Sequence, residues 1–366
     1  MNPIPKIILL ILFCFTVNFT YSQFQSQDLE FGTPQKIDSF TGQRASHESI
    51  VINNYLYILG GYLWANNKGT IYKDVQYAYL GNNVATSTLK WKKTTDMNQP
   101  RTGLAVAAHN GFIYALGGSD ENFQPLKSVE YGKLNGDGTI SNWKISPSQL
   151  ILPRSNLSAG IFINKNGQAY LYAIAGVAQI GDQTVHFPSI EFAQINNDGS
   201  IGNWAILPYN MKGGRSTPAS IIYKSKLFII GGWGDLLFDD IFSDIQYTDL
   251  DDNGLIEPWH TSPYALKTHS YGHYSVVAEI EKKAYIIVTG GSLGQGNTVD
   301  FIQYSPIDSA SGMNPWIIAS NRINGKRWGH SAAYSSGHLY ILGGADGSTF
   351  MNDVQVVSVK KISKSY

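Results

Sequence analysis

The sequence predicts an all-β fold, a six-bladed β-propeller of four-stranded antiparallel blades that is closed by its own N-terminal strand. Three observations support this fold class. A segment ending in Gly-Gly or Ala-Gly occurs six times, and each copy is followed by an alternating apolar segment. No run after the N-terminal segment shows convincing helical periodicity. The copies at 56–61 and 339–344 are identical and read LYILGG.

The first two strands of each repeat are predicted from an Arg and from the glycine pair. An Arg is followed by small and apolar residues, and the segment ending in the glycine pair comes next, with a period of about 57 residues. In the fifth copy, SYGHYSV, Ser270 takes the place of the Arg. The arginines are Arg44, Arg101, Arg154, Arg215 and Arg327. The second segments are 56–61, 113–118, 171–176, 227–232, 286–291 and 339–344.

The third and fourth strands follow from a V/I-x-aromatic pattern and from a Trp. Turns such as Asp137-Gly138 and Asn253-Gly254 separate the two segments, and such dipeptides favour tight hairpins because both central residues need positive φ. The third segments are 75–80, 129–134, 190–195, 245–250, 302–307 and 354–359. The tryptophans are Trp91, Trp143, Trp204, Trp259 and Trp316.

Six such sheets are expected to stack around one axis, because a single four-stranded sheet cannot bury both of its faces. The sixth repeat has no Trp strand, and the segment 29–40 stands before the first repeat without partners. We therefore expect 29–40 to complete the last blade. The prediction is one domain over 23–366, with repeats near 44–91, 101–143, 154–204, 215–259, 270–316 and 327–359.

The first 22 residues are predicted to be a secretory signal peptide. Lys6 precedes an apolar run over 7–15, and small or polar residues surround Ser22, so we expect cleavage near Ser22/Gln23. The apolar run is too short to cross a bilayer. The expected location is secreted, periplasmic or at the cell surface. Lipidation of Cys14 is an alternative that the bulky Phe13 before it disfavours.

Composition excludes several classes of function. Cys14 is the only cysteine, so the chain after the predicted cleavage site has no disulfide, thiolate metal site or cysteine nucleophile. Lys and Arg total 27, as do Asp and Glu, and no basic stripe is present, which argues against a nucleic-acid partner. No second apolar run has membrane-spanning length. We expect a monomer without a cofactor or bound metal.

The repeat resembles a known family. An Arg, often with His three residues later, then an aromatic with Gly-Gly, then V-x-Y, then Trp, is similar to the kelch repeat of kelch β-propellers, and the resemblance covers about 44–359. It implies the propeller fold. It says far less about function, because kelch residues mostly pack one blade against the next.

The strand order predicts where a ligand would bind. In an antiparallel hairpin the start of strand one lies beside the end of strand two, so the Arg segments and the segments after Gly-Gly share one end of the propeller. Three tryptophans outside the repeat pattern fall there. Flat aromatic faces suit a sugar ring or a partner side chain, although packing of loops is the alternative interpretation. The candidate ligand-binding residues are Tyr62, Trp64, Trp233, Asp235, Tyr271, Trp328 and Asp346.

Two other sets of residues are open to structural and functional interpretations. His47, His273 and His330 occupy equivalent positions in three copies that become neighbours when the ring closes. They suit either packing, as in other kelch repeats, or a metal or acid–base site. The repeated arginines suit either an anion site or bonds to backbone carbonyls. We favour the structural interpretation for both sets.

The predicted function is a secreted, non-catalytic kelch propeller that binds a glycan or protein ligand through its aromatic rim. The alternative is an enzyme: the chain resembles a sialic-acid mutarotase in being an exported six-bladed kelch protein of similar size. No catalytic residue of that enzyme can be assigned to a position here, so the catalytic residues are unknown.

Overall fold

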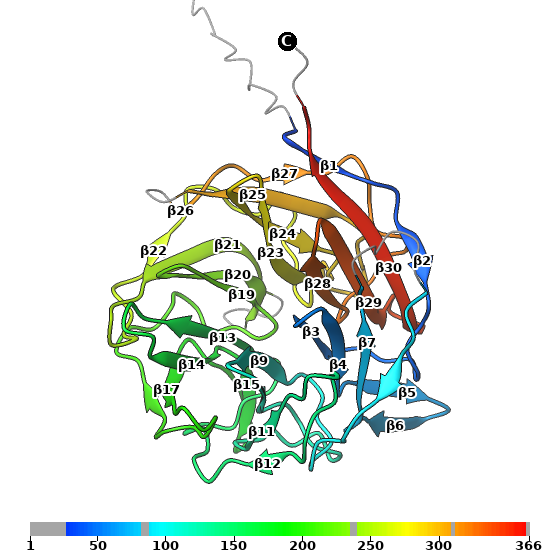
Figure 1. Ribbon diagram of the computed structural model, residues 1–366. Helices are drawn as coiled ribbons and strands as arrows, with labels where there is room; N and C mark the ends of the chain where they lie inside the picture. Colours follow the sequence, from blue (N-terminus) through cyan, green and yellow to red (C-terminus); the bar gives the residue numbers. More distant parts are fainter. Residues whose placement is uncertain (1–26, 82–87, 235–239, 309–311, 364–366) are drawn as a thin grey trace, which may run out of the picture.

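The computed structural model describes residues 27–81, 88–234, 240–308 and 312–363. These residues form six antiparallel sheets of four or five strands, arranged as the blades of a wheel, and two additional two-stranded hairpins (Figure 1). The described residues contain strands, turns and bends but no helix. The predicted signal peptide, 1–22, lies outside the described residues. The fold class is therefore the predicted one, a six-bladed β-propeller.

Blades 1 to 3 each contain four strands that run outward from the axis in chain order. Blade 1 consists of β3 (Glu48–Ile52), β4 (Tyr55–Leu59), β7 (Val75–Tyr79) and β8 (Lys92–Lys93). Blade 2 consists of β9 (Ala105–His109), β10 (Phe112–Leu116), β11 (Val129–Lys133) and β12 (Lys144–Ile145). Blade 3 consists of β13 (Ser158–Ile163), β14 (Ala169–Ile174), β17 (Ile190–Ile195) and β18 (Ala205–Ile206).

Blades 4 to 6 repeat this order. Blade 4 consists of β19 (Ala219–Tyr223), β20 (Lys226–Gly234), β21 (Asp240–Asp249) and β22 (His260–Thr261). Blade 5 consists of β23 (Tyr274–Ile280), β24 (Lys283–Thr289), β25 (Ile302–Asp308) and β27 (Ile317–Ile318), with β26 (Gly312–Met313) beside the end of β25. Blade 6 consists of β28 (Ser331–Ser335), β29 (His338–Ala345) and β30 (Phe350–Lys361), followed outward by β1 (Leu29–Phe31) and β2 (Gln35–Ile37).

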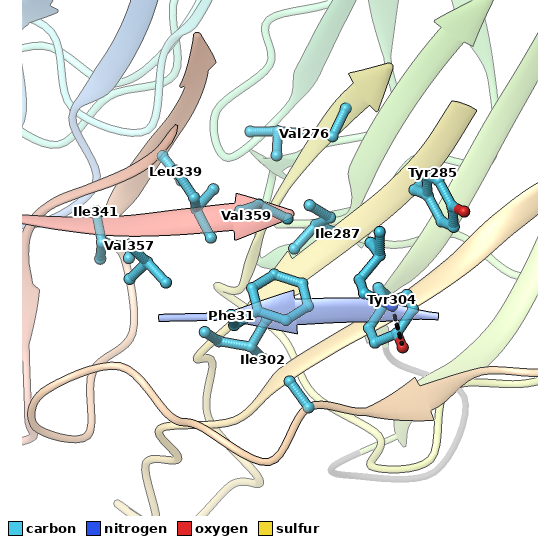
Figure 2. Packing of buried hydrophobic residues seen from close by; sticks show 14 of the residues in the cluster. Phe31, Val276, Tyr285, Ile287, Ile302, Tyr304, Leu339, Ile341, Val357 and Val359 are labelled. Carbon is cyan, nitrogen blue, oxygen red and sulfur yellow. Dashed lines mark hydrogen bonds between the residues drawn. The ribbon is translucent and has the colours of Figure 1, made fainter. Parts of the chain in front are cut away.

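The first strands of the blades line the axis, and the hydrophobic core lies between blades. β3, β9, β13, β19, β23 and β28 contact one another in a closed circle. Each of the six buried apolar clusters joins two neighbouring blades. Figure 2 shows the cluster between blades 5 and 6, where Phe31 packs against Tyr304 with 5.4 Å between ring centroids. Because every interface buries apolar surface from two sheets, each blade depends on its neighbours to cover its apolar faces.

The N-terminal segment occupies the outer edge of blade 6. Lys36 pairs with Gln355, in the same register as Lys93 with Gln76 in blade 1, so β2 stands where other blades have their fourth strand. Phe31 pairs with Val359, the register at which blades 2 to 5 form the base of their outer hairpin. The two ends of the chain therefore share one sheet (Figure 1).

A second connection between the ends involves main-chain bonds alone. In each blade the second residue of the glycine pair donates its N–H to the carbonyl at the Arg position of the next blade, as Gly61 does to Arg101. The last of these six bonds runs from Gly344 to Arg44 across the closure. Both glycines have positive φ, 64° at Gly60 and 93° at Gly61, and a Cβ on Gly60 would overlap the Arg101 carbonyl. In blade 1 the glycine pair therefore fits both the conformation and the space, whereas blade 3 has Ala175 at the first position, with a φ of 57°.

Candidate functional site

One end of the propeller is formed by the two segments that the sequence predicts to lie together. In every blade the residue after the Arg position forms a β-bridge with the residue after the glycine pair. We call this end the rim and define it by these six bridges. They are Ala45–Tyr62, Thr102–Ser119, Ser155–Val177, Ser216–Trp233, Tyr271–Ser292 and Trp328–Ala345. Four of the candidate aromatic residues are themselves bridge partners, so the prediction that they share one end is confirmed.

The most exposed aromatic surface at the rim lies beside blade 1. Here the chain leaves the rim in an additional hairpin of β5 (Tyr62–Ala65) and β6 (Lys68–Ile71), toward the edge of the disc in Figure 1. Trp64 is 53% exposed, and Phe123 from blade 2 is 47% exposed. A Cβ added to Gly69 would touch both rings, at 3.3 Å from Trp64 and 3.5 Å from Phe123, so the two rings are neighbours. Tyr62 packs edge-on against Phe123 and Phe350. We call Tyr62, Trp64, Phe123 and Phe350 the blade 1 cluster.

A second aromatic group lies at blades 3 to 5. The Trp233 ring lies 5.9 Å from that of Tyr271 and 5.1 Å from that of His186, which ends the additional blade 3 hairpin of β15 (Val177–Ile180) and β16 (Gln183–His186). Both Trp233 and Tyr271 are half-buried. Trp328 is also half-buried and lies over Gly272 of the neighbouring blade. The predicted residues thus form separate groups on one rim rather than a single continuous platform.

The two aspartates in the predicted set differ in what the structure says of them. Asp235 lies outside the described residues. Asp346 accepts hydrogen bonds on one oxygen from the N–H groups of Ser348 and Thr349, at 2.9 and 2.8 Å. These bonds lower the pKa of its carboxyl. This oxygen of Asp346 therefore stabilises its own turn, and a ligand-binding role for either aspartate stays a prediction.

The five arginines at the rim are buried and paired inside their own blades. Each donates to the carbonyl of the first residue of the glycine pair, as Arg154 does to Ala175 at 2.6 Å. Each also binds one acid from its third strand or the residue before it. The pairs are Arg44–Asp74, Arg101–Glu130, Arg154–Glu191, Arg215–Asp244 and Arg327–Asp353. With their charge neutralised and their side chains enclosed, these arginines hold the rim together and do not present a free anion site.

Blade 5 shows that the Arg and its acid form a unit. It has Ser270 at the Arg position, and it has Phe301 and Gln303 at the two positions that supply the acid in other blades. The chain therefore loses both charges together. This is the pattern expected when burying one unpaired charge is far more costly than burying neither.

The three histidines of the predicted ring pack against glycines of neighbouring blades. His47 bonds Ser331, His330 bonds Thr289 and His273 bonds Ser270, through ring nitrogen–hydroxyl distances of 3.0, 2.8 and 3.3 Å. Burial lowers the pKa of His47 to about 3 and that of His273 to about 4, and places the pKa of His330 well below its ordinary value. They are neutral at pH 7. Within the described ranges, no three His, Cys, Asp or Glu side chains are grouped so that they could hold a metal.

A cavity of about 120 Å³ lies on the axis beneath the rim. All six blades line it with residues at, or just before, the start of their inner strands. Main-chain bonds connect one blade to the next around its rim end, such as Ser46 N–H to Gly329 O at 2.7 Å and Gly103 N–H to Ser46 O at 2.9 Å. The six residues at this level all have positive φ, and they are Ser46, Gly103, Asn156, Thr217, Gly272 and Gly329.

One acid faces this cavity, and it is not among the site residues predicted from the sequence. Glu48 begins β3, and its carboxyl accepts a 2.6 Å hydrogen bond from the hydroxyl of Tyr274, which comes from blade 5. Burial raises the pKa of the Glu48 carboxyl to about 8. A signal was present: the equivalent positions carry Ala105, Ser158, Ala219, Tyr274 and Ser331, none of them charged. The sequence alone does not show that these positions meet on one axis.

Comparisons with known proteins agree with the repeat. No known family profile matches the chain. Kelch repeat protein C2 of Vaccinia virus (strain Western Reserve) is 28% identical over 148 residues, which cover 40% of this chain and 25% of that protein. Beta-scruin of Limulus polyphemus is 23% identical over 198 residues, covering 52% of this chain and 19% of that protein. Spermatocyte protein spe-26 of Caenorhabditis elegans is 23% identical over 227 residues, covering 52% and 38%.

The chain spans well under half the length of these relatives, so the similarity concerns the repeats and not the whole proteins. Six copies of the motif, six blades built from them and similarity to proteins with kelch repeats all lead to the same assignment. The chain is a kelch-repeat β-propeller.

Proposed function

We propose that this protein is a secreted, non-catalytic binding module that holds a protein ligand on its rim, with Trp64 as the central anchor. The fold supports the proposal that the protein is a binding module, because kelch propellers typically bind proteins. The proposal that the ligand binds at the rim through Trp64 rests on one observation, the two neighbouring exposed rings of Trp64 and Phe123. A single exposed ring is common on a protein surface, but neighbouring exposed rings that form one apolar patch are typical of an interaction site.

The side chains around Trp64 favour a protein over a sugar as the ligand. Trp64 offers a flat face that would also stack on a sugar ring. A protein is favoured because Tyr62, Phe123 and Phe350 extend the surface around Trp64 into a mainly apolar cluster, whereas a sugar site needs several polar groups beside each ring. Glycan binding and the mutarotase alternative stay predictions from the sequence.

The chain offers a matched pair of variants for the test. Trp64 and Tyr79 are equally exposed, at 53% and 54%, but Tyr79 ends β7 at the opposite end of the blade from the rim. Peptides selected from a phage-displayed library on the wild-type protein are titrated against Trp64→Ala and Tyr79→Ala, and a glycan array is probed in parallel. We expect Trp64→Ala to weaken peptide binding by about thirtyfold, the loss typical of a central aromatic anchor, and Tyr79→Ala to have no effect.

The outcomes separate the parts of the proposal. If glycans bind in a Trp64-dependent manner and peptides do not bind, the rim is still the binding site but its ligand is a glycan. If peptide or glycan binding is unchanged in Trp64→Ala, the rim is not the binding site. Acceleration of sialic-acid anomer exchange, measured by NMR, would favour the mutarotase instead.

Secretion is part of the same proposal and rests on the N-terminal sequence. No helix among the residues that the structure describes is long and apolar enough to cross a membrane. The exported protein is expected to begin near Gln23 by mass spectrometry. Leu10→Arg, which interrupts the apolar run, should leave the full-length chain inside the cell, and export of this variant would contradict the assignment.

A further inference from the structure

The central cavity contains one carboxyl without a cation. Its lining includes residues from all six blades but no Lys or Arg. Glu48 takes part in none of the ion pairs of the described residues. The nearby guanidinium groups of Arg44 and Arg327 are each bound to an aspartate of their own blade. An acid shielded from water is normally paired with a cation or kept neutral, and the half-buried Glu48 has no cation and is kept neutral by its raised pKa.

The remaining lining supplies hydrogen-bond acceptors and room. Ser46, Asn156, Thr217 and Ser158 are among the residues around the cavity. A volume of about 120 Å³ is several times what one water molecule needs. It accommodates the end of an unbranched side chain but not an element of secondary structure. A compact group with three donors matches one carboxyl surrounded by hydroxyl and amide oxygens.

The hydrogen bond between Glu48 and Tyr274 favours a primary ammonium over a guanidinium as the bound cation. The Tyr274 hydroxyl occupies Oε2 of Glu48 at 2.6 Å. A guanidinium binds a carboxylate best through two parallel bonds, one to each oxygen, and here one oxygen is already bound. A primary ammonium needs only one carboxylate oxygen, because its other donors can bond elsewhere.

We propose that the central cavity is a binding site for a primary alkylammonium group, such as the end of a lysine side chain, with Glu48 as its counter-ion. This site is distinct from the aromatic clusters, and it stands whether or not the rim binds a protein. An ammonium that enters the cavity gives Glu48 the countercharge that the protein does not supply. The neighbouring His47 and His330 do not compete for this role, because both are uncharged at neutral pH.

Binding of the cation should be linked to loss of a proton from Glu48. Without a cation, Glu48 keeps its proton up to a pKa of about 8, because the surrounding protein removes most of the water that would stabilise its charge. The titratable groups facing Glu48 are Tyr274, whose pKa lies well above its ordinary value, and His47 and His330, whose pKa values lie well below theirs. None of these three groups therefore changes its charge between pH 6.5 and 8.5. Affinity for the ammonium should therefore rise by up to about tenfold per pH unit below pH 8 and level off above it.

The test uses n-butylammonium, with 1-butanol as the uncharged control of similar shape, titrated into the full-length protein by ligand-observed NMR. We expect the wild type to bind n-butylammonium more tightly than 1-butanol at pH 8. Glu48→Gln, which keeps the shape and an acceptor for Tyr274, should weaken n-butylammonium binding by about tenfold or more and leave 1-butanol unchanged. Tyr274→Phe should retain the binding, because Glu48 remains.

Two results would overturn the proposal: equal affinity of the wild type for the two compounds, or affinity of Glu48→Gln for n-butylammonium within twofold of wild type. Thermal unfolding of each variant shows that the propeller is intact. Trp64→Ala should bind n-butylammonium like the wild type, so failure of the rim proposal and failure of this one give different patterns.

Discussion

The paired charges of blade 3 give the sharpest prediction about stability. Arg154 and Glu191 are both fully buried and lie 2.9 Å apart, Nε to Oε1. In Arg154→Met the carboxylate keeps only the N–H groups of Ile151 and Leu152 as partners. An unpaired buried charge costs about 3–5 kcal/mol of unfolding free energy, and Glu191→Gln should cost a similar amount because it leaves the guanidinium unpaired.

The double variant should lose much less than the sum of the two single variants. Arg154→Met with Glu191→Gln removes both charges, which is the solution that blade 5 already uses with Ser270 and Gln303. The remaining loss is mainly the three bonds from Arg154 to the Ala175 carbonyl and to the carbonyl and hydroxyl of Ser189, at about 1 kcal/mol each. We therefore expect the double variant to lose about 3 kcal/mol.

Urea unfolding followed by circular dichroism, with linear extrapolation of the free energy, measures all four proteins of this cycle. The amide that replaces the Glu191 carboxylate should still accept a hydrogen bond from the neighbouring backbone, as Gln246 does from Lys212 in blade 4. Free-energy losses that simply add, so that the double variant loses about 6 kcal/mol or more, would refute the view that the Arg and its acid are retained as a unit.

Three further predictions concern the blade interfaces, the pH dependence and the closure. Tyr57→Phe removes the hydroxyl that donates to the Gly138 carbonyl of blade 2 at 2.8 Å, so we expect a loss of about 1 kcal/mol by urea unfolding, with Tyr79→Phe unchanged as the exposed control. Because burial holds the pKa of His330 well below its ordinary value of 6.5, the unfolded chain takes up a proton there first. Stability should therefore fall as pH decreases below 6.5, and His330→Gln should make this decrease shallower by up to about 1.4 kcal/mol per pH unit; an unchanged slope would contradict the assignment. Phe31→Ala should cost about 3–5 kcal/mol and speed cleavage of the N-terminal segment in limited proteolysis, and a wild-type urea midpoint would show that the segment contributes little.

The repeat by itself predicted the architecture, because its information is local. Alternation of apolar residues, the turn dipeptides and the glycine pair each act over a few residues, and six copies fix the number of blades. The order of segments also placed Tyr62, Trp233, Tyr271 and Trp328 at one end, since antiparallel pairing brings the two segments together. The structural interpretation of the arginines followed from the same regularity, and their buried ion pairs agree with it.

The tertiary structure decided everything that depends on which blades meet. The sequence does not show that Glu48 and Tyr274, 226 positions apart, share one hydrogen bond, because that contact exists only once the ring has closed. Nor does it show that Trp64 is exposed beside Phe123 while Trp233 is half-buried, since exposure depends on how loops from neighbouring blades pack. Pairing within a sheet is determined by short-range pattern, whereas a cavity on the axis is created by six strands that are distant in the chain. For this protein the sequence therefore determined the scaffold, and the closure of the ring determined the chemistry at its centre.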